Sequence, residues 1–273
     1  MPEEPGLIAI CGRVIGPLAG VLLGWSYWIS LWCATAVVAT TATSYLGALW
    51  PAISATPLRT ALSGSVIVLA ITALNLRGAR AAGQFQVVTT VLKLLPLVAV
   101  VAILAGLAAQ GGVQFSVDRH PPFAMGQLTP ALTLAFFAIL SFETASMVTE
   151  RVRDPARNVV RATLIGLAAT VALYVLVCMG IIMALPTEAL NASSAPVAYF
   201  VERFWGTWAG SAVAVLTAVS GIGYVNSAIL LQGELPLSAV RGGMMPGWVA
   251  PTNRHDVAVA PMALASLFSV TLM

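Results

Sequence analysis

Three charged side chains lie within or beside long apolar stretches of this sequence. They are Lys93, Glu143 and Glu234. A charge is expensive to keep in apolar surroundings, so such residues usually bind an ion or solute, exchange a proton, or pair with a neighbour. Glu234 follows Leu-Leu-Gln-Gly at the end of its apolar stretch, which favours an interfacial position. Lys93 and Glu143 are therefore the stronger candidates for chemistry.

Glu143 belongs to a polar cluster that also contains Ser141, Thr144 and Ser146. One interpretation is a helix that breaks near Ser141, so that its freed backbone groups face a water-filled cavity and Glu143 braces or gates the break. The alternative is a continuous helix in which Glu143 reaches the interface or bonds to a neighbour. The density of small and polar residues favours the break.

Lys93 has two apolar neighbours on each side, near the middle of its apolar stretch. A lysine in such surroundings is suited to proton exchange or to replacing a coupling cation. The alternative is a lysine paired permanently with a carboxylate or with helix carbonyls, and the sequence does not separate the two. Pro96 frees one carbonyl a turn earlier and allows a kink there.

The elements that position these residues are expected to be membrane helices. The chain has 273 residues, of which 59% are hydrophobic and only 8% charged. A soluble domain carries roughly a quarter charged residues, so an ordinary soluble enzyme is excluded. A membrane helix needs about twenty mostly apolar residues. Seven segments meet this need: Ile15–Trp50, Leu58–Leu76, Phe85–Leu107, Ala131–Val148, Thr163–Leu185, Gly206–Leu231 and Ala258–Met273.

The first segment is longer than one straight crossing requires, so we expect a tilted helix or an added re-entrant part. The last segment reaches the end of the chain without polar flanks, which predicts a truncated chain. Polar stretches between the segments are too short to fold alone, so residues 1–273 are expected to form a single transmembrane domain.

Basic residues in the connecting loops predict the orientation. One alternate set of loops carries nine arginines and the opposite set carries three. The positive-inside rule places the first set, and with it the N-terminus, in the cytoplasm. Because orientation explains these charges, no nucleic-acid partner is expected. Cys11, Cys33 and Cys178 have no metal-binding spacing, so neither a metal nor another cofactor is predicted.

A weak internal repeat links two segment starts. The sequence IGPLAG at Ile15 resembles WGTWAG at Trp205, and the two segments are five apart and cross in opposite directions. An inverted five-helix repeat has this property, although two glycine-rich helix starts also resemble each other by chance.

Four stretches give the chain a wider resemblance. They are GPLAGVLLGWSYWISLWCATA, NLRGARAAGQFQVVTTVLKLLPL, FFAILSFETASMVTERVRDPARNVVRATLIG and ILLQGELPLSAVRGGMMP. In this order they resemble the amino acid–polyamine–organocation superfamily of amino acid permeases, and within it the arginine/agmatine antiporter group. The resemblance implies an all-α membrane protein with a partial inverted-repeat transporter bundle, its seven spans matching the family's third to ninth helices.

The resemblance also implies roles for individual residues. Phe137 matches an aromatic gate over the substrate, and the carbonyls of Phe137, Ala138 and Leu140 match those that receive an α-ammonium group. Ser141 lies in the same substrate-binding stretch. Thr35 matches a polar side chain that contacts substrate. Tyr27 and Glu143 match members of a gate below the site. Lys93 matches a coupling lysine.

The implied function is transport of an amino acid or related amine by alternating access, without enzymatic chemistry. The resemblance implies a location in the inner membrane, where the protein contacts lipid. It also allows a homodimer. The family's first, second and tenth helices have no match, Phe137 replaces a tryptophan, and Ala228 replaces another aromatic residue. A non-transporting truncation product, or a subunit that completes a bundle in trans, is therefore the main alternative. A retinal protein would need a lysine in its last span, and an intramembrane enzyme would need a paired catalytic set.

Overall fold

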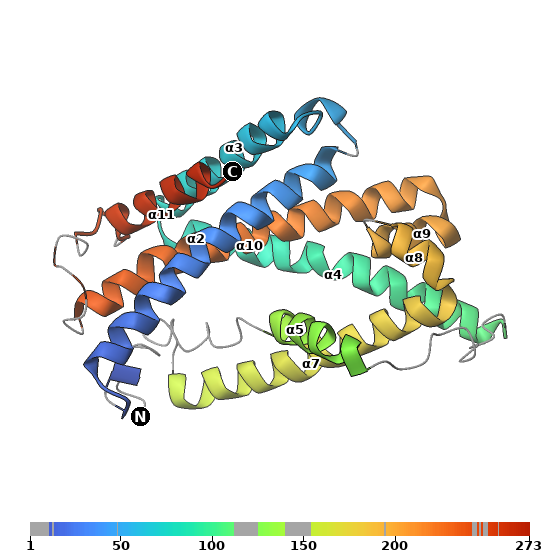
Figure 1. Ribbon diagram of the computed structural model, residues 1–273, viewed down its shortest axis with the longest axis horizontal. Helices are drawn as coiled ribbons and strands as arrows, with labels where there is room; N and C mark the ends of the chain where they lie inside the picture. The colour runs from blue at the N-terminus through green and yellow to red at the C-terminus, as the bar shows by residue number, and fades with distance from the viewer. Residues whose placement is uncertain are drawn as a thin grey trace. The chain divides into compact units, whose positions relative to one another are not determined.

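The described parts of the chain fold mainly into α-helices (Figure 1). The computed structural model describes residues 1–273 except 1–10, 13, 48, 112–124, 140–153, 194, 242–244, 246, 248–250 and 256. The α-helices are α2 (Pro17–Gly47), α3 (Pro57–Asn75), α4 (Ala79–Ala109), α5 (Leu128–Ile139), α7 (Pro155–Ala184), α8 (Thr187–Ala192), α9 (Pro196–Trp205), α10 (Thr207–Arg241) and α11 (Val259–Thr271). Two short 3-10 helices are η1 (Pro51–Ile53) and η3 (Met125–Gln127). An isolated bridge joins Thr252 to Ala258, and the described residues contain no β-strand.

Five of the described helices are long and apolar enough to cross a membrane. They cover Pro17–Gly47, Pro57–Asn75, Arg80–Ala109, Arg157–Ala184 and Thr207–Leu237, and each coincides with a segment predicted from the sequence. The segment predicted at the C-terminus is the shorter apolar helix α11. The segment predicted from Ala131 to Val148 begins within α5, and its remainder lies outside the described residues. The prediction of an all-α membrane protein is confirmed.

Helix α2 accounts for the unusual length of the first predicted segment. It runs for 31 residues without a break. At 1.5 Å per residue this is about 46 Å, against about 30 Å for the hydrocarbon core of a bilayer. The extra length is therefore continuous helix, and the re-entrant part that the sequence allowed does not occur within α2.

Proline marks the start of several helices. A proline has no N–H, and the first N–H groups of a helix have no partner within it, so proline is well tolerated there. At the start of α3, the Thr56 hydroxyl oxygen also accepts a hydrogen bond from the Arg59 N–H at 3.3 Å. Helices with proline in the first turn are α2, α3, α7 and α9.

The described chain divides into two compact units. Unit 1 comprises residues 1–95 and 214–273, and unit 2 comprises residues 96–213. The boundaries fall inside α4, at Pro96, and inside α10, so each of these helices contributes residues to both units. The assignment of the whole chain to a single domain stays a prediction.

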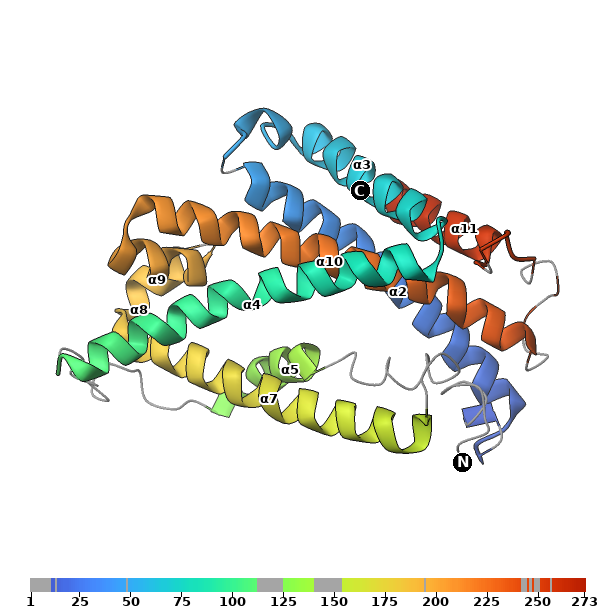
Figure 2. The same cartoon turned by 180° about the vertical axis from the view of Figure 1, so that it is seen from behind.

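Unit 1 is built from α2, α3, α11 and parts of α4 and α10. Helix α11 packs against α3 and α2, and Figures 1 and 2 show α11 beside α3 from both sides. The core is made of small and medium aliphatic side chains: Ala39, Val68, Ile71, Val225, Ile229, Val257 and Met262. Helices meet closely at glycines, since a Cβ added at Gly221 would lie 3.1 Å from the Ala42 Cβ. Small residues at helix contacts are typical of membrane proteins, where van der Waals packing drives association.

The turn between α3 and α4 needs glycine. Gly78 has a φ of +110°, a backbone conformation that residues with a Cβ rarely adopt. Its N–H donates to the Asn75 carbonyl at 2.9 Å. The segment before α11 holds this turn, because the Asn253 side chain donates to the Leu76 carbonyl at 2.9 Å. Asn253 also accepts from the His255 N–H at 2.8 Å.

Unit 2 contains α5, α7, α8, α9 and the remaining parts of α4 and α10. Its core joins α4, α7, α9 and α10 through Val100, Ile103, Val177, Ile181, Leu185, Phe200, Val201, Ala209 and Val213. Phe200 is fully buried, and its ring centre lies 5.0 Å from that of Phe204. The short helix α9 therefore covers the ends of longer helices with an aromatic residue.

The contact between α10 and α4 in unit 1 yields a first prediction. A Cβ added at Gly223 would lie 2.9 Å from the Thr89 Cβ, an atom that no side-chain rotation can move. Gly223→Ala should therefore lower the free energy of unfolding by about 1–3 kcal/mol, the usual cost of overpacking. Thermal unfolding of the purified protein in detergent measures the change.

Gly83→Ala is the matched control on α4, because nothing lies within 4 Å of its added Cβ. Alanine has the higher helix propensity, so this variant should be neutral or more stable by up to about 1 kcal/mol. Equal unfolding temperatures for the two variants would contradict the close packing of Gly223.

Candidate functional site

The structure describes some of the site residues predicted from the sequence and leaves others outside its range. Thr35 and Tyr27 lie on α2, and Lys93 lies on α4, all within unit 1. The backbones of Phe137 and Ala138 belong to the end of α5 in unit 2. The remaining predicted residues, Leu140, Ser141 and Glu143, lie outside the described residues, and so does the predicted helix break.

Thr35 is part of a buried polar contact between α2 and α10. Both Thr35 and Gln232 are fully buried. The Gln232 Nε2 donates to the Thr35 Oγ1 at 2.9 Å, and the Thr35 hydroxyl donates to the Leu31 carbonyl at 2.7 Å. This bond joins residues that are 197 positions apart in the chain.

The hydrogen bonds fix the orientation of the Gln232 amide. Because the Leu31 carbonyl can only accept, the single proton of the Thr35 hydroxyl is committed to it. Thr35 must therefore accept from Gln232, which requires the Nε2 group to face it. The Gln232 Oε1 is left buried, without a hydrogen-bond partner among the described residues.

The backbone of Gln232 is also tied to α2. In a regular helix its carbonyl would accept from the N–H four residues later, but that residue is Pro236, which has none. The Trp28 indole Nε1 instead donates to this carbonyl at 3.1 Å. Trp28 is 7% exposed and packs edge-on against Trp25, with ring centres 5.7 Å apart. One residue of α10 is therefore held to α2 through both its backbone and its side chain.

A second buried cluster joins α3, α4 and α10 through side-chain amides. The Asn75 Nδ2 donates to the Asn226 Oδ1 at 3.0 Å and to the Ile71 carbonyl at 3.0 Å. The Asn226 Nδ2 donates to the Gln86 Oε1 at 2.9 Å and to the Ala82 carbonyl at 3.1 Å. Asn75 and Asn226 are almost completely buried. Since backbone carbonyls accept only, both amide orientations are fixed, and the Asn75 Oδ1 is left without a partner among the described residues.

Hydroxyl groups connect α11 to its neighbours. The Thr72 and Ser266 hydroxyl oxygens lie 2.7 Å apart between α3 and α11. The single proton of the Ser269 hydroxyl is shared between the Trp32 carbonyl of α2 at 3.0 Å and the Ala265 carbonyl of α11 at 2.9 Å. The Trp32 ring contacts Phe268 with ring centres 5.0 Å apart, although its buried Nε1 has no partner in the described part. Neutral hydrogen bonds and ring contacts therefore hold α11 in place.

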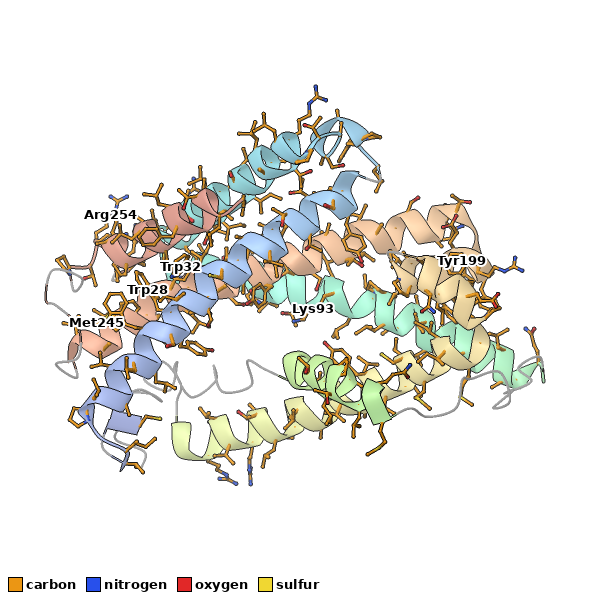
Figure 3. The ribbon with its side chains drawn as sticks, viewed as in Figure 1. Trp28, Trp32, Lys93, Tyr199, Met245 and Arg254 are labelled. Atoms are coloured by element: carbon orange, nitrogen blue, oxygen red, sulfur yellow. The ribbon has the colours of Figure 1, made fainter. Side chains whose placement is uncertain are left out.

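The charged candidates occupy different surroundings from these neutral clusters. Lys93 is exposed on α4, and the described residues hold no carboxylate paired with it (Figure 3). Its predicted coupling role stays a prediction. Glu234 is half-buried near the end of α10 and makes contacts of its own. Tyr27 is half-buried as well, and its carbonyl accepts from the Ser30 hydroxyl at 2.7 Å.

The sequence analysis missed most of the residues that make these clusters. The missed residues are Trp28, Asn75, Gln86, Asn226 and Gln232. Four of them are polar or amphipathic residues within a predicted apolar segment, and Gln232 directly follows the segment that ends at Leu231, which was the available signal. Many serines and threonines share that signal while bonding only to their own helix, as Thr43 does to the Ala39 carbonyl at 2.9 Å. The signal therefore could not select the residues that join helices.

These features define a multi-pass α-helical membrane protein whose helices are joined by buried, uncharged polar groups. Comparison with protein families gives a match to the family described as amino acid permease over residues 1–273. The chain belongs to the amino acid permease family. The membrane character of the helices agrees with this membership, because five of them are long and apolar enough to span.

Individual relatives show what the chain is similar to. It is 27% identical over 286 residues to an arginine/ornithine antiporter of Latilactobacillus sakei, covering 100% of this chain and 60% of the relative. It is 30% identical over 247 residues to an uncharacterized transporter of Mycobacterium bovis, covering 89% and 53% respectively. It is 24% identical over 278 residues to a cadaverine/lysine antiporter of Escherichia coli K12, covering 100% and 61%. The chain thus spans between 53% and 61% of the length of these relatives.

The bond between Trp28 and the Gln232 carbonyl gives a second prediction. Trp28→Phe removes the indole donor and leaves a buried carbonyl unpaired, which should cost about 1–3 kcal/mol of unfolding free energy. Adding Pro236→Ala restores a backbone N–H four residues after Gln232, so the double variant should recover part of the loss. A double-mutant cycle of thermal unfolding in detergent measures the coupling. Strictly additive effects would show that Trp28 acts by packing alone.

Proposed function

We propose that the protein transports an amino acid or a related amine across the cytoplasmic membrane by alternating access. The observation that carries this proposal is the amino acid permease match over residues 1–273. Relatives named as arginine/ornithine and cadaverine/lysine antiporters support an amine-bearing substrate and an exchange mode. Proton-coupled symport is the other mode that the family resemblance allows. No covalent chemistry is required of the protein in either mode.

The proposed substrate site combines backbone and side-chain groups. The carbonyls of Phe137, Ala138 and Leu140 receive the α-ammonium group, with Ser141 beside them and Phe137 closing over the substrate. Thr35 contributes a hydroxyl group from α2. Helix ends and free backbone groups near mid-membrane carry partial charges that suit a zwitterion. The buried position of Thr35 on α2 supports a polar role inside the protein.

The remaining proposed residues act as a gate and in coupling. Tyr27 and Glu143 close the passage below the substrate, and Lys93 carries or senses the coupling charge. A ligand shifts a transporter between outward and inward states only by binding them with different affinity. We further propose that the N-terminus is cytoplasmic, following the nine arginines against three in the loops, and that lipid surrounds the protein, with a homodimer as a possible assembly.

The chain matches only part of the length of its relatives, and this observation supports a second candidate function. The chain covers 53% to 61% of them, so it can also act as one part of a bundle that a further segment completes in trans. Counterflow by the chain alone, compared with counterflow after co-expression of the unmatched helices of a relative, separates the two candidates.

Counterflow in proteoliposomes tests the transport proposal. Vesicles containing the full gene product and loaded with unlabelled lysine should accumulate labelled lysine, arginine, ornithine or cadaverine. Phe137→Ala should raise the concentration for half-maximal counterflow about tenfold or more while leaving the amount of purified protein unchanged. Lack of counterflow for every labelled amino acid and amine would refute the proposal, and an unaffected Phe137→Ala variant would remove the gate assignment.

Lys93→Ala tests the coupling role. If Lys93 carries the coupling charge, the variant should lose proton-dependent uptake while keeping exchange between two amino acid pools. Uptake is measured from pH 5 to pH 8 with and without an imposed pH gradient, and Lys93→Arg serves as the control that keeps the charge. A pH profile identical to that of the unaltered protein would exclude Lys93 from coupling.

A further inference from the structure

The turn between α3 and α4 and the segment before α11 meet within unit 1, although they are far apart in the sequence. The Asn253 Nδ2 donates to the Leu76 carbonyl at 2.9 Å, across 177 positions of the chain. The same segment packs against the turn at Gly78, where an added Cβ would lie 3.2 Å from the His255 Cβ. The Asn253 Oδ1 accepts from the His255 and Val257 N–H groups at 2.8 and 3.2 Å, which folds the segment around this side chain. Residues 76–80 and 252–255 therefore form one local surface, which we call the turn junction.

The turn junction gathers basic side chains from both segments. Arg77 and Arg80 belong to the turn, Arg254 belongs to the other segment, and all three are exposed. The Arg254 Nε donates to the His255 Nε2 at 3.1 Å, so its two terminal NH₂ groups have no partner in the described part of the chain (Figure 3). The next residue along the chain is Asp256, which lies outside the described residues. Three arginines against this one carboxylate leave the two segments with a net positive charge.

This positive surface lies where two membrane helices end and begin. The turn connects Pro57–Asn75 with Arg80–Ala109, two helices long and apolar enough to span a bilayer. Helix α4 continues from the turn with exposed residues at a spacing of four, three and four, which places them in one row along its surface. These residues are Arg80, Gln84, Val87 and Val91. The row is polar at the turn and apolar further along, where Val87 and Val91 are 65% and 58% exposed.

We propose that the turn junction binds the headgroup phosphate of an anionic phospholipid, with an acyl chain along the apolar end of the α4 row. Guanidinium groups form strong, bidentate hydrogen bonds with phosphate oxygens, and basic residues next to a membrane attract anionic lipids. A phospholipid has the same order of charged and apolar parts as the α4 row, whereas a soluble anion would leave the apolar part unused. This inference does not depend on the transport proposal, and it narrows the general contact with lipid to one headgroup site.

Lipid binding to the purified full chain in neutral detergent tests the proposal. Native mass spectrometry compares dioleoylphosphatidylglycerol with dioleoylphosphatidylcholine, which has the same acyl chains and a zwitterionic headgroup. The unaltered protein should bind phosphatidylglycerol more tightly. Arg77→Gln combined with Arg254→Gln should weaken this binding about tenfold or more, because each arginine near an anionic surface contributes about fivefold. Equal affinity of the unaltered protein for the two lipids would overturn the proposal.

Two further variants separate a built site from a general effect of charge. Arg157→Gln with Arg161→Gln removes the same charge from exposed positions on α7 and should keep the affinity for phosphatidylglycerol. Equal weakening by both arginine pairs would overturn the site. Asn253→Ala keeps every charge but removes the bond to Leu76, so it should also weaken binding. Unchanged affinity in this variant would overturn the role of the junction, and if the variant does not fold, the two arginine pairs decide.

Glycerol phosphate identifies the source of the bound phosphate group. It carries the phosphate without acyl chains, so it should not displace phosphatidylglycerol at an equal concentration. Displacement under this condition would indicate a site for a soluble anion and would overturn the assignment to lipid.

Discussion

A backbone polar group in the hydrocarbon region of a membrane must find its partner within the protein, and this constraint organises the structure. Continuous helices satisfy it almost everywhere, as in the 31 residues of α2. Pro236 creates an exception on α10, since it cannot donate to the Gln232 carbonyl. The Trp28 indole supplies that donor from a residue 204 positions away. A local defect in one helix thereby becomes a specific contact between two helices.

Uncharged side chains form further hydrogen bonds between helices in unit 1. Amides join α3, α4 and α10, and hydroxyl groups join α11 to α3 and α2. Such hydrogen bonds contribute about 0.6 kcal/mol each on average in membrane proteins, so their value lies in direction and register as well as in energy. Glycines allow close approach of helices elsewhere in this unit, as at Gly221 against Ala42 and Gly223 against Thr89. The result is a set of helices held in register without ion pairs among the contacts described.

Among these contacts, those of Gln232 on α10 involve Thr35, a residue of the proposed substrate site. Kinks in helices fall most often at prolines, and α10 carries Pro236 four residues after Gln232. Gln232 holds Thr35 on α2 and retains a free acceptor.

The sequence by itself determined the class of the protein and the course of its helices. Apolar length is a local property, so the predicted segments coincide with α2, α3, α4, α7 and α10, and the resemblance to amino acid permeases followed from contiguous stretches. Charge within an apolar run is also local, which is why Lys93 and Glu143 were singled out. Only the tertiary structure identified Gln232 and Asn226, whose partners lie 197 and 151 positions away. Partnership between distant polar groups depends on which helix faces meet, and no local pattern encodes that.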